Sequence, residues 1–196
     1  MAKTRTKRKR AVGAVACGAA ALALGGLLVP AAAQAEETVC RGALGAVTVD
    51  NLLVPQGANC ALTGTRVQGT IKVQRNAALN AAGVRVIGNV QGENARNVVV
   101  RGGSRVGGSV QVVQGQAATV RDSVVTQDIL YDHNRAALRA ISNTVGGNIQ
   151  AFQNTGGVQI SFNRVNGNLQ CKENVPPPTG GGNVVQGNKE DQCARL

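Results

Sequence analysis

Residues 125–139, with the sequence VTQDILYDHNRAALR, hold the side chains best suited to acid–base chemistry. A carboxylate, an imidazole and a phenol close together could serve as general acid and general base. We take as candidate catalytic residues Asp128, Asp132, His133 and Arg135, with Tyr131 and Arg139 nearby. If this segment is a regular strand, however, Asp128 and Tyr131 point to opposite faces, because side chains alternate along a strand.

Other chemistry is poorly represented. The serines at 123, 142 and 161 lack the G-x-S-x-G context of a serine hydrolase. One histidine excludes a multi-histidine metal site, and the aspartates at 122, 128 and 132 do not follow a calcium-loop spacing. We therefore expect no cofactor and no metal. With only three aromatic residues, the chain also lacks the stacking platforms of nucleic-acid-binding proteins.

The pattern Val-x-Gly-x-(Ile/Val/Leu) recurs along most of the chain. Its leading valines, two of them in degenerate copies, are Val67, Val86, Val106, Val125, Val145, Val165 and Val185. The steps between them are 19 or 20 residues, and apolar residues alternate strictly within each unit, as in a strand with one buried face. Shorter apolar alternations follow later in the unit, for example Val98 with Val100 and Val158 with Ile160.

A repeat of this length with two or three short strands predicts an all-β parallel β-helix of about seven coils. The alternative is a leucine-rich repeat, but its recurrent leucine spacing is absent. Asn and Gly tolerate the left-handed backbone of a sharp corner, and we expect corners at Asn76, Asn94, Gly115, Asn134, Asn154 and Asn174. We expect the triple proline and triple glycine of residues 176–182 to interrupt the regular coils.

The Val-x-Gly-Asn-(Val/Ile)-Gln units and the tail NVVQGNKEDQC at 183–193 resemble small exported proteins of high-GC Gram-positive bacteria. That family forms right-handed parallel β-helices, and the resemblance covers residues 36–196. It implies the handedness of the coil and export from the cell. It supplies no activity and no catalytic residues.

The first 35 residues read as a cleaved Sec signal peptide. The segment MAKTRTKRKR holds six of the 21 basic residues, an apolar stretch follows at 11–29, and Ala33-Gln34-Ala35 is a signal-peptidase site. We predict cleavage between Ala35 and Glu36 and a secreted or cell-wall-associated product without stable membrane insertion. Two alternatives are a retained membrane anchor, disfavoured by four glycines and Pro30, and lipidation at Cys17, disfavoured by its flanking sequence.

Residues 36–196 are expected to form a single domain with a repeat core at about 47–188. Four cysteines remain in it, and an even number in an exported chain indicates disulfides. Cys40 and Cys60 are one repeat apart, and Cys171 and Cys193 are one repeat plus two residues apart. Neighbouring coils are close enough for a disulfide, so we predict Cys40–Cys60 and Cys171–Cys193, the latter closing a loop at 171–193.

Stacked coils align equivalent residues in rows, and two rows are candidate binding surfaces. Outward amides form the first, at Asn89, Gln91, Gln111, Asn148, Gln150, Asn168 and Gln170. They either stabilise the sheet by bonding to each other or bind polysaccharide hydroxyls. The second row is Arg66, Arg85 and Arg105, whose charges repel at about 5 Å unless anions or nearby acids neutralise them.

These features favour a non-enzymatic surface or matrix protein whose partner is an anionic or neutral cell-wall polysaccharide. The alternative is a polysaccharide lyase or hydrolase centred on residues 125–139. Nucleic acid is not an expected partner, because the charge after cleavage is only +5, from 15 basic and 10 acidic residues. No oligomeric state is predicted.

Overall fold

The computed structural model describes residues 36–196, which form three parallel β-sheets. The predicted signal peptide, Cys17 and Ala35 of the cleavage site lie outside the described residues. Sheet A has nine strands: β1 (Glu37–Val39), β4 (Asn51–Val54), β7 (Ile71–Val73), β10 (Val90–Glu93), β13 (Val110–Val113), β16 (Ile129–Asp132), β19 (Ile149–Phe152), β22 (Leu169–Lys172) and β25 (Lys189–Asp191).

Sheets B and C have eight strands each. Sheet B consists of β2 (Ala43–Leu44), β5 (Asn59–Thr63), β8 (Ala78–Ala82), β11 (Asn97–Arg101), β14 (Ala117–Arg121), β17 (Leu138–Ile141), β20 (Val158–Ser161) and β23 (Thr179–Gly181). Sheet C consists of β3 (Thr48–Val49), β6 (Arg66–Val67), β9 (Arg85–Val86), β12 (Arg105–Val106), β15 (Val124–Val125), β18 (Thr144–Val145), β21 (Arg164–Val165) and β24 (Val184–Val185).

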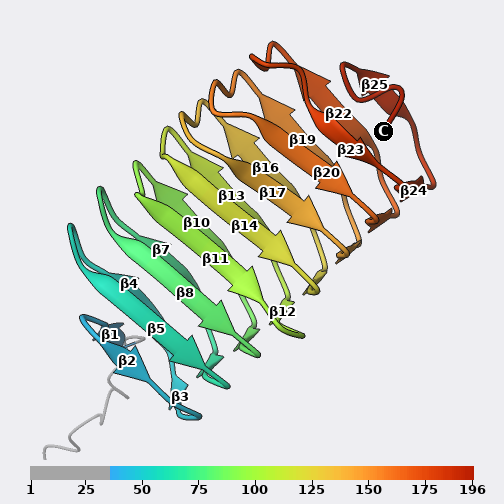
Figure 1. Ribbon diagram of the computed structural model, residues 1–196. Coiled ribbons are helices and arrows are strands. Elements are labelled where there is room, and N and C mark those ends of the chain that lie inside the picture. The colour runs from blue at the N-terminus through green and yellow to red at the C-terminus, as the bar shows by residue number, and fades with distance from the viewer. Residues whose placement is uncertain (1–35) are drawn as a thin grey trace, which may run out of the picture. The chain divides into compact units, whose positions relative to one another are not determined.

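The chain visits sheets A, B and C in turn, and each strand pairs in parallel with the strands three places before and after it (Figure 1). This is a parallel β-helix. Seven coils run from β4–β6, here coil 1, to β22–β24, coil 7, with a coil of shorter strands at β1–β3 before them and β25 after the last. The predicted all-β fold of about seven stacked coils is confirmed.

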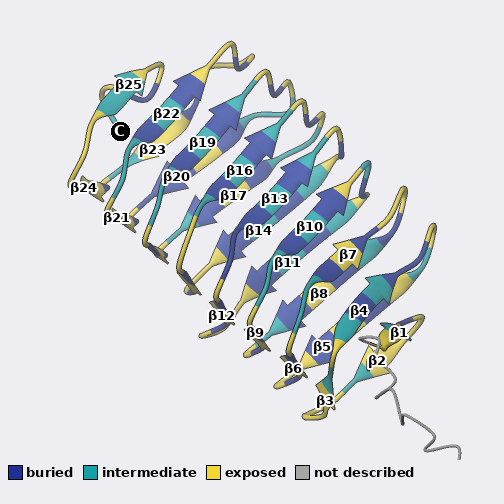
Figure 2. Ribbon diagram, turned by 180° about the vertical axis from the view of Figure 1, so that it is seen from behind, coloured by how far each residue is buried: buried dark blue, intermediate teal, exposed yellow. Residues whose placement is uncertain are grey.

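The core fills the space between the three sheets. The leading valines of coils 1 to 6 are at most 1% exposed, and the rows beside them include Ile71, Val90 and Ile129 at 0%. Figure 2 shows the buried residues along the strands and the exposed ones at the turns between them. Each strand is too short to bury much apolar surface alone, so the stacking of neighbours stabilises the fold.

The structure corrects the prediction for the start of each unit. The alternation from Val67 to Val73 is not one strand, because β6 belongs to sheet C and β7 to sheet A, with a corner at 68–70 between them. Gly69 occupies this corner, where a Cβ would collide with Oδ1 of Asn51 in the preceding coil. The motif glycine therefore permits close stacking at a corner rather than a flat strand.

The predicted corners between sheets A and B lie in the right place, but their left-handed residues are partly different. Asn76 (φ 56°) and Asn94 (φ 52°) have the expected positive φ. In coils 4 to 7 the residue with positive φ comes one position earlier than predicted, at Gln114, His133, Gln153 and Glu173. The neighbouring asparagines of coils 5 to 7 are instead buried, with a role in hydrogen bonding.

The expected interruption at residues 176–182 is also wrong. Thr179–Gly181 forms β23, which pairs with β20 in regular register. Gly180 (φ 133°) and Gly181 (φ 143°) adopt backbone conformations that only glycine reaches without strain, so the glycine run continues the coil.

Both predicted disulfides are present, one near each end of the solenoid. The Cα atoms are 5.6 Å apart in Cys40–Cys60 and 5.2 Å apart in Cys171–Cys193. Disulfides of this kind indicate an oxidising compartment. Within residues 36–196 no helix has the length and apolar character to cross a membrane.

Candidate functional site

The arginine row consists of Arg66, Arg85 and Arg105, in β6, β9 and β12 of sheet C. The three residues are in register, Arg66 opposite Arg85 and Arg85 opposite Arg105, so they lie one strand spacing of about 4.8 Å apart. In each strand the arginine is exposed and the following valine is buried. The buried valine fixes the strand, and alternation then directs the arginine outward.

None of these three guanidinium groups forms an ion pair or a side-chain hydrogen bond with residues 36–196. Other arginines are held by neighbours: Arg121 pairs with Asp122 at 3.0 Å, and Arg101 donates to Oδ1 of Asn80 at 3.2 Å. In the next two coils Val124 and Thr144 occupy the row, and Arg164 follows. The structure thus gathers three unpaired cations on one surface.

The glutamines of the predicted amide face form a row on sheet A. Gln91 and Gln111 are in register, as are Gln150 and Gln170, with Leu130 interrupting the row between the two pairs. Gln91 donates from Nε2 to Oε1 of Gln111 at 3.3 Å, and Gln150 donates to Gln170 at 2.9 Å. This row is partly exposed and retains free donors and acceptors for a ligand.

The asparagines predicted for the same face have a structural role. Oδ1 of Asn89 accepts a hydrogen bond from the backbone N–H of Ser109 in the next coil, at 2.8 Å. Asn148 accepts in the same way from Asn168, and Asn168 from Asn188. These bonds join each corner to the next coil, so the oxygens of Asn89, Asn148 and Asn168 already have partners within the chain.

The acid–base residues of the 125–139 segment do not converge on one site. Tyr131 points into the core, where its hydroxyl donates to the carbonyl of Arg139 at 2.7 Å and burial raises the pKa of the phenol well above its usual range. Oδ1 of Asp128 accepts from the backbone N–H of Asn148 at 2.7 Å.

The remaining candidates lie along the surface of coil 5. Asp132 is at the end of β16, and its Oδ1 is 2.8 Å from Nδ1 of the corner residue His133. Arg135 follows in the turn that leads to sheet B, and Arg139 is exposed on β17. Of the predicted set, only Asp132 and His133 are in direct contact through their side chains.

The unusual Gln127 of this segment has a structural explanation. In the other coils the equivalent residue is glycine. A Cβ at this position would collide with a side-chain oxygen of the preceding coil, as a Cβ on Gly108 would collide with Oδ1 of Asn89. Below Gln127 that position is occupied by the shorter Ser109, whose Oγ lies 3.3 Å from Oε1 of Gln127. The two departures from the repeat therefore accommodate each other.

Two buried asparagine ladders were not predicted as such. In one, Asn134, Asn154 and Asn174 bond from coil to coil, and each Nδ2 also donates to a carbonyl of the coil before it. In the other, Asn143, Asn163 and Asn183 do the same beside sheet C. The recurrence of asparagine two residues before three successive leading valines was a signal for the second ladder.

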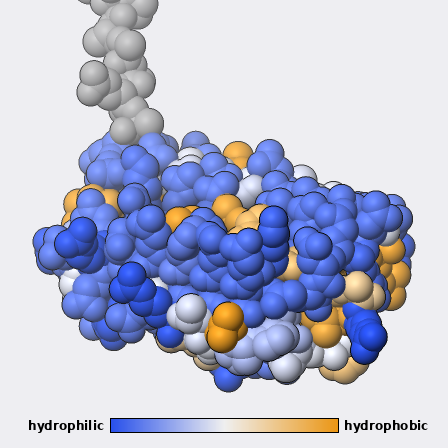
Figure 3. Space-filling view, turned by 90° about the horizontal axis from the view of Figure 1, so that it is seen from above, coloured by the Kyte–Doolittle hydropathy of each residue, from blue (hydrophilic) through white to orange (hydrophobic). Residues whose placement is uncertain are grey.

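A polar groove on sheet A, lined by Lys72, Arg75 and Glu93, was also not predicted, because these residues come from different rows. The face shown in Figure 3 is mostly hydrophilic, with small hydrophobic patches scattered over it. Residues 36–196 contain no group of three or more His, Cys, Asp or Glu side chains that could hold a metal ion. No protein-family model, curated protein or solved structure matches this chain.

Proposed function

We propose that the protein is an exported, non-enzymatic surface or matrix component that binds an anionic polymer along the arginine row. The observation that carries the proposal is the register of Arg66, Arg85 and Arg105, exposed and without an acidic partner among the described residues. Like charges about 5 Å apart repel by about 1 kcal/mol in water, and an anion between them removes this repulsion.

The ligand that fits this surface is extended and repetitive. A polymer with an anionic group on each unit, such as a teichoic acid or an acidic polysaccharide, can contact several arginines at once, which raises its affinity without any deep pocket. The two disulfides support a location outside the reducing cytoplasm, where such polymers occur.

Neutral polysaccharide on the glutamine row is a second candidate. Its support is the partly exposed row of Gln91, Gln111, Gln150 and Gln170, which offers carboxamide donors and acceptors at a regular spacing. No aromatic residue adjoins this row to stack on a sugar ring except Phe152, which lies in β19 beside Gln150.

One experiment separates these functions from the enzymatic alternative. Immobilised acidic and neutral polysaccharides are incubated with the protein, and binding, new reducing ends and unsaturated products are all measured. The proposal predicts retention on acidic polymers without turnover. Retention on neutral polymers alone would favour the glutamine row, and product formation that is lost in Asp132→Asn would favour a lyase or hydrolase.

A further inference from the structure

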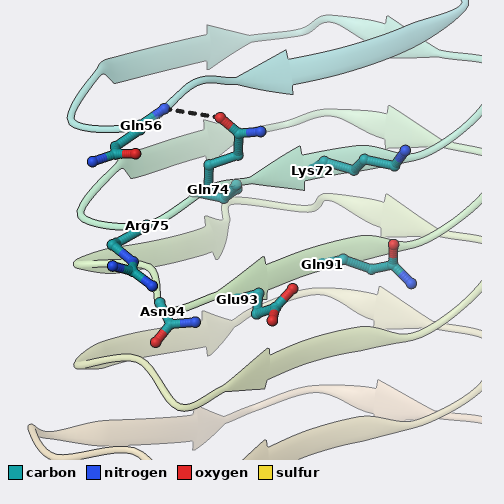
Figure 4. A pocket seen from close by; sticks show the side chains of 8 residues that line it. Gln56, Lys72, Gln74, Arg75, Gln91, Glu93 and Asn94 are labelled. Atoms are coloured by element: carbon teal, nitrogen blue, oxygen red, sulfur yellow. Dashed lines mark hydrogen bonds between the residues drawn. The ribbon is translucent and has the colours of Figure 1, made fainter.

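A second candidate site lies on the outer surface of sheet A, away from the arginine row. It is a groove of ≈520 Å³ where coils 1 to 3 turn from sheet A toward sheet B. Its walls are the ends of β7 and β10 with the corners that follow them (Figure 4). Lys72, Gln74 and Arg75 come from coil 2, and Gln91, Glu93 and Asn94 come from coil 3.

The groove coincides with a change in corner conformation. In coils 1 and 2 the corner is a hydrogen-bonded turn, with Ala58 N–H donating to Pro55 and Ala77 N–H to Gln74, each at 3.0 Å. In coil 3 the residue with positive φ is Asn94, and it comes one position earlier relative to the strand than Asn76 does in coil 2. Arg75 and Asn94 therefore lie at the junction of two corner types.

One wall of the groove is fixed by a hydrogen bond. Oε1 of Gln74 accepts from the backbone N–H of Gln56 at 3.0 Å, the bond drawn in Figure 4. The charged side chains of Lys72, Arg75 and Glu93 have no ion pair or hydrogen bond with residues 36–196. Three ionised groups are thus available to a ligand in one concave, polar site.

The order of these charges defines the ligand. In Figure 4 Glu93 lies on the strand next to that of Lys72 and, along the strand direction, between Lys72 and Arg75, with the Lys72 side chain extending away from Arg75, so two cations flank one anion in the groove. The complementary molecule carries an ammonium group with one carboxylate on each side of it. The carboxamides of Gln91 and Asn94 add neutral donors and acceptors beside these charges.

We propose that this groove binds an acidic α-amino acid such as glutamate. One carboxylate contacts Arg75, whose planar guanidinium can bind it with two hydrogen bonds, the second carboxylate contacts Lys72, and the ammonium contacts Glu93. This site is independent of the arginine row, and nothing in the proposal requires polymer binding.

The test is a titration of the isotope-labelled protein, followed by the amide resonances of β7, β10 and the two corners. The ligands are L-glutamate, glutarate, which lacks the ammonium, and lysine, which has the inverse charge pattern. Sodium chloride at matched ionic strength is the control for screening. We expect saturable shifts in the order glutamate, glutarate, lysine.

Two variants make the assignment specific. Glu93→Gln is expected to lower the affinity for glutamate by about two- to fivefold and to raise the affinity for glutarate by a similar factor. The substitution removes the attraction of Glu93 to the ammonium of glutamate and its repulsion of the carboxylates of glutarate. Arg75→Gln is expected to weaken both ligands. Arg139→Gln, an exposed arginine on sheet B, is the matched control and should change neither.

Equal binding of glutamate and glutarate to the unaltered protein would overturn the proposal, as would a Glu93→Gln variant that affects both in the same direction. Shifts that sodium chloride reproduces would show that there is no site. Replacing Arg66, Arg85 and Arg105 by Gln should leave glutamate binding intact, so this outcome is independent of the fate of the arginine row.

Discussion

At the scale of single residues, buried asparagines hold the coils in register. Asn154 is fully buried, donates from Nδ2 to the carbonyl of Tyr131 and to Asn174, and accepts from the backbone and side chain of Asn134. No buried side-chain nitrogen or oxygen of the described residues lacks a hydrogen-bond partner. These hydrogen bonds matter because a buried polar group without a partner is strongly destabilising.

We predict that Asn154→Ala lowers the free energy of unfolding by about 3 kcal/mol or more, because it removes the acceptor of the backbone N–H of Asn134, one of the two hydrogen bonds of Nδ2 of Asn134 and a donor to the carbonyl of Tyr131. Urea unfolding followed by circular dichroism measures the effect. Asn166→Ala is the control, since Asn166 is exposed on a corner of sheet C and should change stability by less than about 0.5 kcal/mol. Equal losses in the two variants would contradict a role for the ladder.

At the scale of the coil, the residue that fits at a corner depends on the residue stacked against it in the neighbouring coil. Where one coil places a side-chain oxygen at this corner, the next coil has glycine, as in the pair Asn148 and Gly167. The exception is Ser109 with Gln127, where the shorter side chain of Ser109 leaves room for the Cβ of Gln127. Coils can therefore vary in sequence only where the neighbouring coil compensates.

This pairing predicts non-additive substitutions. Ser109→Asn should destabilise the protein, because its longer side chain meets Gln127, whereas the same change combined with Gln127→Gly should restore the ordinary pair. We expect a coupling free energy of about 1–3 kcal/mol between the two positions, measured by a double-mutant cycle of urea unfolding. Additive effects would mean that the two residues are independent.

The sequence predicted the elements that depend on periodicity and missed those that depend on contacts between coils. A step of 19 or 20 residues determines which valines stack, and it also identified both disulfides and the alignment of the arginines. The conformation of the corners is harder to predict from the sequence. The left-handed residue and the ladder asparagine are adjacent, as His133 and Asn134 are, and asparagine is favoured in both roles. The groove beside Glu93 arises from a change in corner conformation that no repeat pattern encodes.

At the scale of the whole molecule, the solenoid is secured at its ends. Terminal coils pair on one side only, so they are the least stable part of a repeat fold. Cys40–Cys60 and Cys171–Cys193 each join neighbouring coils there, closing loops with separations of 20 and 22 residues. Each bridge is expected to stabilise the folded state by about 3 kcal/mol in the chain-entropy model.

Reduction should therefore loosen the ends before the centre. We expect amide hydrogen exchange to accelerate first near residues 40–60 and 171–193, while β13 and β16 in the central coils stay protected. Exchange measured by mass spectrometry with and without a reductant provides the comparison. Uniform acceleration along the chain would show that the bridges act on global stability rather than on the terminal coils.

If the arginine row binds a polyanion, as we propose, its affinity for the polymer falls as the salt concentration rises. Binding of poly(glycerol phosphate) or an acidic polysaccharide is measured over a range of salt concentrations for the unaltered protein and for the variant with Arg66, Arg85 and Arg105 replaced by Gln. A matched variant with Arg101, Arg121 and Arg139 replaced by Gln has the same net charge as the variant of the arginine row.

Neutralised charges release counterions, so the plot of log affinity against log salt should have a slope of about −2 to −3 for the unaltered protein. We expect the slope to approach zero when the three arginines of the row are replaced and to stay clearly negative in the matched variant, with the thermal unfolding temperature almost unchanged in both. Equal slopes for the unaltered protein and the row variant would contradict it.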